Sequence, residues 1–393
     1  MKTVYLDHCA TTPLHPEVLK AMLPFLRDAF GNPSSAHALG RTAREAVEEA
    51  RGRVADLIGA RPAEIVFTSG GTEADNLAIQ GIARARRDRG NHIVTSAIEH
   101  HAVTRTCEYL AGNGFTITYL PVDRHGVVNP EDVRRALTDK TILVTIMHSN
   151  NEVGTIEPIS EIGKMVAERG VTFHTDAVQS VGKVPLDVKE LQVDMLSIAA
   201  HKLYGPKGIG ALYIKEGTKI EPILYGGEQE NGIRSGTENV ASIAGLGMAC
   251  EVARRTVSAS MKRIGKLRDA LQERISASIQ DLTINGHPAS RLPGVLSISV
   301  PGIAAELIVR NLDARGIAVS AGSACTSHSV EISHVLSAMG LSKDIAQGTV
   351  RMSLGIKSTP DEIEYAASSF IDVAGKLKTL SDIENSLGSR RCS

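Results

Sequence analysis

Over the first 230 residues, short runs rich in β-branched side chains alternate with stretches of helical periodicity. The strand-like runs cover residues 65–68, 93–96, 116–121, 142–148, 171–175, 195–199 and 210–214. Helical spacing covers residues 34–58, 130–137 and 159–169, and Gly59 and Gly170 supply the glycine that commonly ends a helix. Parallel strands need long crossover connections, so this order predicts an α/β fold with a mostly parallel seven-stranded sheet covered by helices on both faces.

The pattern changes after a glycine-rich loop at residues 226–236. Residues 239–280 form a nearly unbroken helical pattern, followed by strand patterns at 296–300 and 317–320 and helical patterns at 304–314 and 360–380. This order predicts a smaller α+β C-terminal domain. We expect residues 15–257 to form the large domain, and residues 1–14 and 258–393 to form the small one.

Charge, hydropathy and cysteine content limit which kinds of partner the protein can bind and which cellular compartment it fits. The formal net charge is −1, so the chain has no overall field that would attract nucleic acid or an anionic membrane. No stretch approaches the roughly 18 to 20 apolar residues of a transmembrane helix. The 5 cysteines are odd in number and widely spaced, which fits a reducing compartment better than a disulfide framework. We therefore expect a cytoplasmic protein without nucleic-acid or membrane partners.

Polar residues follow several predicted strands, at the edge where open parallel sheets bind ligands. Gly71 and Thr72 come after the first strand and begin a helix, whose free backbone N–H groups suit a phosphate. A tight turn with Thr72 as the helix cap is the alternative interpretation. Asp176 and Gln179 follow the strand at 171–175, and a carboxylate there can hold a cationic ring nitrogen, although a helix cap is its commoner role.

Lys202 follows the apolar strand at 195–199, where a solvated surface lysine is out of character. A lysine that is partly desolvated near other cations can form a Schiff base. A phosphate cradle, a carboxylate for a ring nitrogen and such a lysine are the three groups that pyridoxal phosphate needs. No single one of them is specific, but together they point to this cofactor.

A series of sequence blocks carries a more specific signal, because the blocks resemble those of one enzyme family in the same order. They are YLDHCATTP (5–13), FGNPSSAH (30–37), FTSGGTEADN (67–76), EHHAV (99–103), SNNEVGTIEP (149–158), HTDAVQSVGK (174–183), AAHKLYGPKGIGALY (199–213), IRSGTEN (233–239), SAGSACTS (320–327) and VRMSLG (350–355). The family is that of the cysteine desulfurases of the nitrogen-fixation and iron–sulfur-cluster type, within the class V aminotransferases. The resemblance implies the aspartate-aminotransferase fold, which is pyridoxal-phosphate fold type I.

The resemblance also implies a role for each matching residue. Lys202 would form the Schiff base with pyridoxal phosphate and shuttle the α-proton of the substrate. Asp176 would keep the pyridine nitrogen protonated, while His100 would stack on the ring and take part in acid–base steps. The other implied ligands are Gln179 for the phenolic oxygen, Gly71, Thr72 and His201 for the phosphate, Thr237 for the partner subunit's cofactor in a homodimer, and Asn151 and Arg351 for the substrate carboxylate.

Cys325 lies among small and hydroxyl side chains at residues 320–329, which offer little apolar packing. The resemblance implies that its thiolate takes the sulfur of L-cysteine as a persulfide, leaving L-alanine. The sulfur would then pass to an acceptor protein such as an iron–sulfur scaffold. Cys325 and His328 alone are too short a pattern to indicate a metal site, so we expect none.

One position departs from the family, and three other interpretations stay open. Ala199 stands where the family commonly has serine, three positions before the lysine, which removes one phosphate donor unless Ser197 or a water replaces it. A selenocysteine lyase would share the fold and cofactor, and an aminotransferase of the same fold would leave Cys325 without a role. A non-enzymatic scaffold is disfavoured by the set Lys202, Asp176 and Cys325.

Overall fold

The computed structural model describes residues 3–322 and 332–389, with side chains up to residue 380. Its largest element is a seven-stranded sheet in the order β2-β8-β7-β6-β5-β3-β4. The strands are β2 (Ile65–Thr68), β3 (His92–Ser96), β4 (Thr116–Leu120), β5 (Thr141–Thr145), β6 (Thr172–Asp176), β7 (Met195–Ala199) and β8 (Gly210–Ile214). Only β8 pairs antiparallel with its neighbours within this sheet. The predicted mostly parallel, seven-stranded sheet is therefore confirmed.

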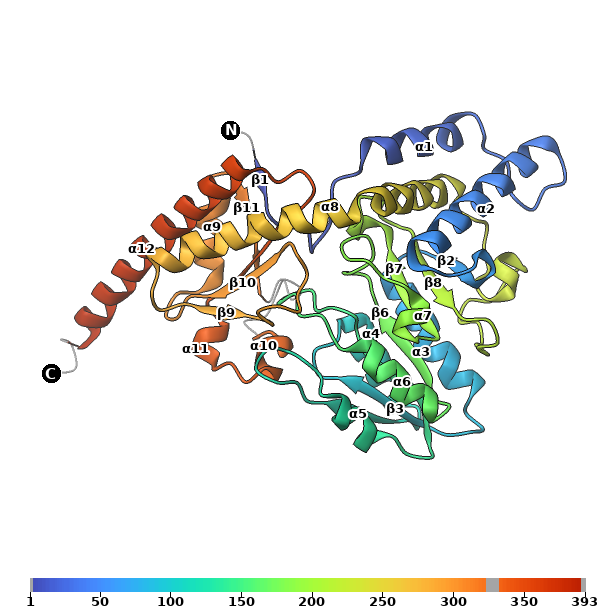
Figure 1. Cartoon of the computed structure of the whole chain (residues 1–393), viewed down its shortest axis with the longest axis horizontal. Helices are drawn as coiled ribbons and strands as arrows, with labels where there is room; N and C mark the ends of the chain where they lie inside the picture. Colours follow the sequence, from blue (N-terminus) through green and yellow to red (C-terminus); the bar gives the residue numbers. More distant parts are fainter. Residues whose placement is uncertain (1–2, 323–331, 390–393) are drawn as a thin grey trace.

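Helices cover both faces of this sheet (Figure 1). One face buries α2 (Ala38–Ile58), α5 (Pro130–Ala136), α6 (Ile159–Glu168) and α7 (Val188–Leu191), and α1 (Pro16–Arg27) packs against α8 (Val240–Ser278). The other face buries α3 (Gly71–Ala85) and α4 (His101–Ala111). The local signals explain the helix ends: Gly59 closes α2 in the left-handed conformation at φ 71°, and Asn129 caps α5 by accepting from the Glu131 N–H.

A second, antiparallel sheet lies beside the first, with the strand order β12-β13-β10-β9 (Figure 1). Its strands are β9 (Thr283–Asn285), β10 (Val295–Ser299), β12 (Ser320–Ala321) and β13 (Thr349–Ser353). It packs with α9 (Ala305–Asp313) and α12 (Pro360–Ser389), and the short helices α10 (His334–Ala338) and α11 (Lys343–Ala346) precede β13. Within the described ranges, no helix has the length and apolarity needed to cross a bilayer.

The helix α8 (Val240–Ser278) runs through both halves of the molecule as one 39-residue element (Figure 1). Its first part buries Leu246 and Cys250 in the core of the seven-stranded sheet, and its last part buries Leu271 and Ile275 in the core of the antiparallel sheet. Two hydrophobic cores joined by one helix agree with the expectation of a large and a small domain. The expected boundary at residue 257 falls inside α8 and stays a prediction.

Two expectations for the C-terminal part need correction. The single strand expected at 317–320 is two short strands, because β11 (Ile317–Ala318) pairs with β1 (Val4–Tyr5) and β12 pairs with β13. The last helix continues to Ser389 instead of ending near residue 380. Its apolar periodicity fades after residue 380, but no proline stops the backbone there.

Candidate active site

A cavity of about 360 Å³ opens at the carboxyl ends of the parallel strands. Its walls come from the segments after β2, β6 and β7, from the N-terminal residues Cys9 and Ala10, and from β13. The predicted site residues that line it are Gly71, Thr72, His100, Asn151, Asp176, Gln179, His201, Lys202 and Arg351. Residues from distant parts of the chain thus meet where the sheet topology predicts a ligand.

Lys202 lies in a short helical turn directly after β7 and points into this cavity. Its Nζ donates to the backbone carbonyls of Cys9 at 2.5 Å and Ala10 at 2.8 Å. Burial, followed by the charge of Lys183, lowers the pKa of Lys202 to about 8. A larger fraction of this amine is therefore unprotonated at neutral pH than for a free lysine, which makes it a competent nucleophile.

Two buried carboxyl groups lie near each other in the cavity wall. Asp176 ends β6, where its Oδ1 accepts from the Val178 N–H at 2.9 Å. Burial raises the pKa of Asp176, while His100 and Lys202 oppose the shift. Asp75 on α3 was not predicted, although it lies three residues after Thr72 and so on the same helix face. Burial and the neighbouring Asp176 raise the pKa of Asp75 well above its usual range.

The two histidines in the wall are neutral at physiological pH. The Nδ1 of His100 accepts from the Ala102 N–H at 3.1 Å, so the neutral ring carries its proton on Nε2. Burial is the main cause that lowers the pKa of His100. Burial and Lys202 lower the pKa of His201 to about 4, and its Nδ1 lies 3.1 Å from the Thr11 hydroxyl. Both rings can therefore exchange hydrogen bonds without adding charge.

The N-terminus of α3 forms the polar end of the cavity. Gly70 precedes it at φ 154°, a backbone conformation open essentially to glycine. A Cβ on Gly71 would come within 2.7 Å of Val178 Cγ2, so glycine keeps this corner of the cavity open. In the described part of the chain, no side chain caps this helix end. Its free N–H groups and positive dipole end remain available for an anion.

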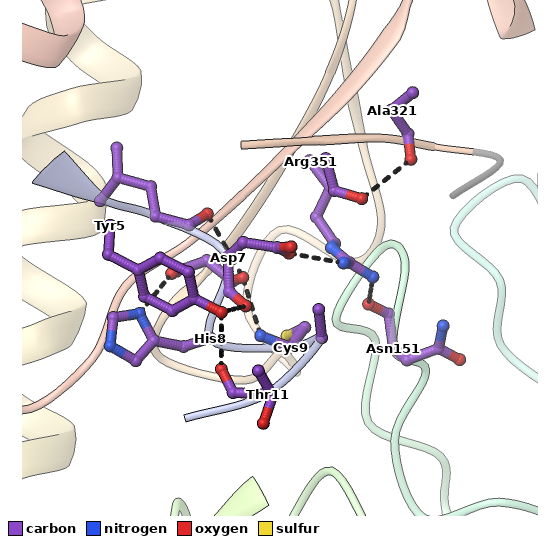
Figure 2. Close-up of polar contacts among 12 residues, drawn as sticks. Tyr5, Asp7, His8, Cys9, Thr11, Asn151, Ala321 and Arg351 are labelled. Carbon is purple, nitrogen blue, oxygen red and sulfur yellow. Dashed lines mark hydrogen bonds and ion pairs between the residues drawn. The ribbon is translucent and has the colours of Figure 1, made fainter. Parts of the chain in front are cut away.

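Arg351 on β13 lies across the cavity, held by two partners (Figure 2). One Nη donates to Asp7 Oδ1 at 2.8 Å, and the other donates to the backbone carbonyl of Asn151 at 2.9 Å. Its Nε is buried, with no hydrogen-bond partner among residues 3–322 and 332–389. The guanidinium is thus fixed in place with donor capacity left for a carboxylate. Asp7 was not predicted, although it lies in the block at 5–13.

Comparison with known proteins identifies the family. The profile described as "Aminotransferase class-V" matches residues 4–366. The chain belongs to the class V aminotransferase family. It is 51% identical over 380 residues to a protein named cysteine desulfurase IscS from Dictyoglomus turgidum, covering 97% of this chain and 96% of that protein.

Two solved structures superimpose closely on this chain. A structure titled "NIFS-LIKE PROTEIN" has a TM-score of 0.90 at 39% identity and covers 95% of this chain and 100% of its own. One titled "SspA in complex with cysteine" has a TM-score of 0.80 at 38% identity, with 91% and 100% covered. The family resemblance and the fold expected from the sequence blocks are confirmed.

Two predicted residues of this class V chain are not among those that line the cavity in the described ranges, for different reasons. Thr237 is exposed in the loop before α8 and is not among the described residues that line it. A role in a partner subunit's site stays a prediction for Thr237. Cys325 lies outside the described residues, as does His328. Gly322, three residues before Cys325, does line the cavity.

Ala199 is buried in the cavity wall, where the family commonly has serine. Ser197, two residues earlier, is fully buried and lies with its Oγ 3.0 Å from His174 Nε2. The Ser197 hydroxyl is therefore used inside the sheet and does not replace the missing donor.

The cavity fits pyridoxal phosphate, the cofactor of class V enzymes. An uncapped helix end with the Gly71 corner suits the phosphate, and a buried carboxyl with an amine of lowered pKa suits a pyridine ring and its aldehyde. The Oδ1 of Asp75 is buried behind this wall and has no hydrogen-bond partner within the described chain, with His174 Nε2 at 3.7 Å as its neighbour.

Proposed function

We propose that this protein is a pyridoxal-phosphate-dependent cysteine desulfurase. It converts L-cysteine to L-alanine and passes the sulfur, as a persulfide on Cys325, to an acceptor protein for iron–sulfur cluster assembly. The observation that carries this proposal is the Lys202 amine, which lies with Asp176 and Arg351 around one cavity. The identity with the IscS protein from D. turgidum supports the same activity.

Arg351 and Asn151 bind the substrate carboxylate in this proposal. The Arg351 guanidinium is planar, buried and braced by Asp7, so its free donor capacity is presented in one orientation. Asn151 contributes its carbonyl to Arg351 and lines the cavity beside it. This end of the cavity therefore orients an α-amino acid by its carboxylate, whatever its side chain.

Five residues would hold the phosphate and ring of the cofactor, in addition to Lys202. Gly71, Thr72 and His201 would bind the phosphate, Asp176 would bind the ring nitrogen and Gln179 would donate to the phenolic oxygen. Pyridoxal phosphate, when bound, supplies an electron sink for the electron pair left on the substrate α-carbon. A protonated ring nitrogen beside Asp176 would oppose the effect of burial on its pKa, as His100 and Lys202 do, and so favour the charged carboxylate.

Proton transfer falls to Lys202 and His100. Lys202 Nζ would be the atom that holds the cofactor aldehyde, and the same amine would accept the α-proton of the substrate. Its lowered pKa, about 8, lies close to the operating pH, which suits a group that must both take and return a proton. His100 offers its Nε2–H as a donor beside the ring.

The sulfur leaves on Cys325. Its thiolate forms an S–S bond with the substrate sulfur while the substrate Cβ–S bond breaks. The electron pair of that bond stays on the carbon skeleton, which takes up protons and leaves as L-alanine. Sulfur is thereby transferred without an external oxidant or reductant, and a thiol acceptor then discharges the persulfide.

We also propose a cytoplasmic homodimer, with Thr237 serving the partner subunit's cofactor. Four exposed apolar side chains on and after α1 favour a buried interface there: Leu19, Leu23, Leu26 and Phe30. Sedimentation of the holoenzyme gives the oligomeric state, and a monomer with full activity would contradict this arrangement.

The activity is tested by incubating the holoenzyme with L-cysteine and a thiol. We expect alanine and sulfide in equal amounts without any keto acid, and mass spectrometry should find one extra sulfur atom on Cys325. A requirement for a keto acid would indicate an aminotransferase instead. An extra sulfur on another cysteine would overturn the role of Cys325, and retained selenocysteine turnover in Cys325→Ala would indicate lyase activity as well.

A further inference from the structure

A second lysine lies behind the cavity, in a position that the proposed mechanism does not use. Lys183 ends the turn after Gln179, where its backbone N–H donates to the Ser180 carbonyl. Its Nζ donates to Gln179 Oε1 at 2.9 Å. Burial lowers the pKa of Lys183, so the position carries a cost that an apolar residue would avoid.

Gln179 is held from two sides by groups of opposite hydrogen-bonding type. The ammonium group of Lys183 can only donate, so it fixes the amide oxygen of Gln179 on its side. The backbone carbonyl of Cys9 can only accept, and it accepts a hydrogen bond from Gln179 Nε2 at 3.0 Å. The two ends of this buried amide are therefore not interchangeable.

The same Cys9 carbonyl also accepts a hydrogen bond from Lys202 Nζ, at 2.5 Å. One continuous chain of hydrogen bonds thus runs from Lys183 through Gln179 and Cys9 to Lys202. Such a chain transmits a change at one end to the other, because each group orients and polarises the next.

We propose that Lys183 is a positioning residue of this site: its ammonium group fixes the orientation of the Gln179 amide and acts through it on the Lys202 amine. Gln179 then always presents its NH₂ group on the side away from Lys183. This inference rests on the proposed function, because it assigns the amide a cofactor oxygen to meet. Its effect on Lys202, however, is a property of the protein without cofactor.

The charges around Lys202 support this role. Lys183 is the largest charged contribution that lowers the pKa of Lys202, and Arg351 acts in the same direction. Cys9 and Asp176 act in the opposite direction. Around Lys183 itself, Cys9 raises and Arg351 lowers the pKa. Removal of the Lys183 charge should therefore leave Lys202 more basic.

The first test uses the full-length protein stripped of cofactor. Trace acetic anhydride labels unprotonated amines, and mass spectrometry of the Lys202 peptide gives the labelled fraction against pH. In Lys183→Met we expect labelling at pH 7.5 to fall about three- to tenfold, which corresponds to half to one pKa unit. Lys183→Arg should restore the native profile. Unchanged labelling in Lys183→Met would overturn the proposal.

Lys189 provides the matched control, because it is an exposed lysine six residues further along the same connection. Lys189→Met removes the same net charge and should leave Lys202 labelling unchanged. If Lys183→Met does not fold, Lys183→Gln replaces it, since glutamine keeps a donor but loses the charge. An equal fall in the Lys189 control would show a non-specific effect and overturn the proposal.

The second test uses the holoenzyme and asks whether Lys183 acts through Gln179. The absorbance of the bound cofactor is titrated with pH in Lys183→Met, Gln179→Leu and the double variant. We expect both single variants to shift the transition, and the double variant to shift it no further. Additive shifts would overturn the route through Gln179. Failure of the proposed function would show differently, as absence of alanine formation by the unaltered protein.

Discussion

Arg351 and Asp7 form a partly buried ion pair between positions 344 residues apart in the chain, with 2.8 Å between Arg351 Nη2 and Asp7 Oδ1. Asp7 belongs to the segment whose carbonyls at Cys9 and Ala10 receive the Lys202 amine. One N-terminal segment therefore holds both the proposed carboxylate-binding cation and the proposed Schiff-base lysine. The spacing of the two groups therefore depends on this segment, whose Asp7 and Cys9 lie beside Arg351 in Figure 2.

Asp7→Asn should destabilise the protein. Arg351 would stay buried and charged but would lose its charged acceptor, and a hydrogen bond to a charged group contributes about 1.5 to 3 kcal/mol. We expect the free energy of unfolding in urea to fall by about 2 kcal/mol. Glu17→Gln is the control, because it breaks the exposed, solvent-screened pair with Arg255 and should leave the free energy of unfolding nearly unchanged. Equal losses in both variants would contradict the buried pair as the cause.

Ala199→Ser should tighten cofactor binding. The Ala199 side chain lies in the cavity wall, 3.5 Å from where a Cβ on Gly71 would lie, so a hydroxyl there would be close to the proposed phosphate site. We expect the dissociation constant for pyridoxal phosphate to fall about tenfold or more, measured by titration of the cofactor-free protein. Ala199→Cys is nearly the same size but donates weakly, so it should not tighten binding. Tightening in both variants would assign the effect to packing.

Gly71→Ala should weaken cofactor binding. The new methyl group would meet Val178 Cγ2 at 2.7 Å and force this stiff side chain toward the cavity. We expect the dissociation constant for pyridoxal phosphate to rise about tenfold. Gly52→Ala is the control, because its Cβ would meet nothing within 4 Å on α2 and alanine favours the helix. Unchanged binding in Gly71→Ala would remove Gly71 from the phosphate site.

The stability of the fold should decrease with rising pH between about 7 and 8. Burial raises the pKa of Glu99 to about 8 and that of Glu157 to about 8. Both carboxyls hold a proton in the folded state at pH values where the unfolded chain has released it. Each therefore stabilises the fold fully below its unfolded pKa and loses this contribution as pH rises through about 8.

Urea unfolding at several pH values checks this prediction. Each carboxyl should contribute a slope of up to about 1.4 kcal/mol per pH unit. The window above pH 7 is chosen because burial lowers the pKa of His8, His148 and His174, which are neutral in the folded state there and mostly neutral in the unfolded chain as well. Glu99→Gln should reduce the slope, whereas an unchanged slope in that variant would contradict a protonated Glu99.

The sequence predicted well those features that depend on local patterns. The strands β2, β7 and β8 agree residue for residue with their apolar runs, because each run is bounded by turn residues. The meeting of Asp176 and Lys202 followed from one rule, that parallel strands end at the same edge of a sheet. Both residues lie at ends of neighbouring strands, β6 and β7.

The unpredicted residues act through partners far away in the chain. The role of Asp7 can be inferred only once the fold places it beside Arg351. The role of Lys183 can be inferred only once the fold places the Cys9 carbonyl against Gln179. Neither contact has a periodicity that a sequence pattern could reveal. The split of the strand at 317–320 has the same cause, since β11 and β12 follow partners in two different sheets.

The length of α8 has a mechanical consequence for catalysis. At 39 residues it is about 58 Å long, and its sequence holds no proline to act as a hinge. A bend of about 5° at its centre would swing the far half, roughly 30 Å long, by roughly 2 to 3 Å. Arg351 belongs to the antiparallel sheet at one end of α8, and Lys202 follows a strand of the seven-stranded sheet at the other end. The bending stiffness of α8 thus limits how much the distance between the Arg351 guanidinium and the Lys202 amine can change.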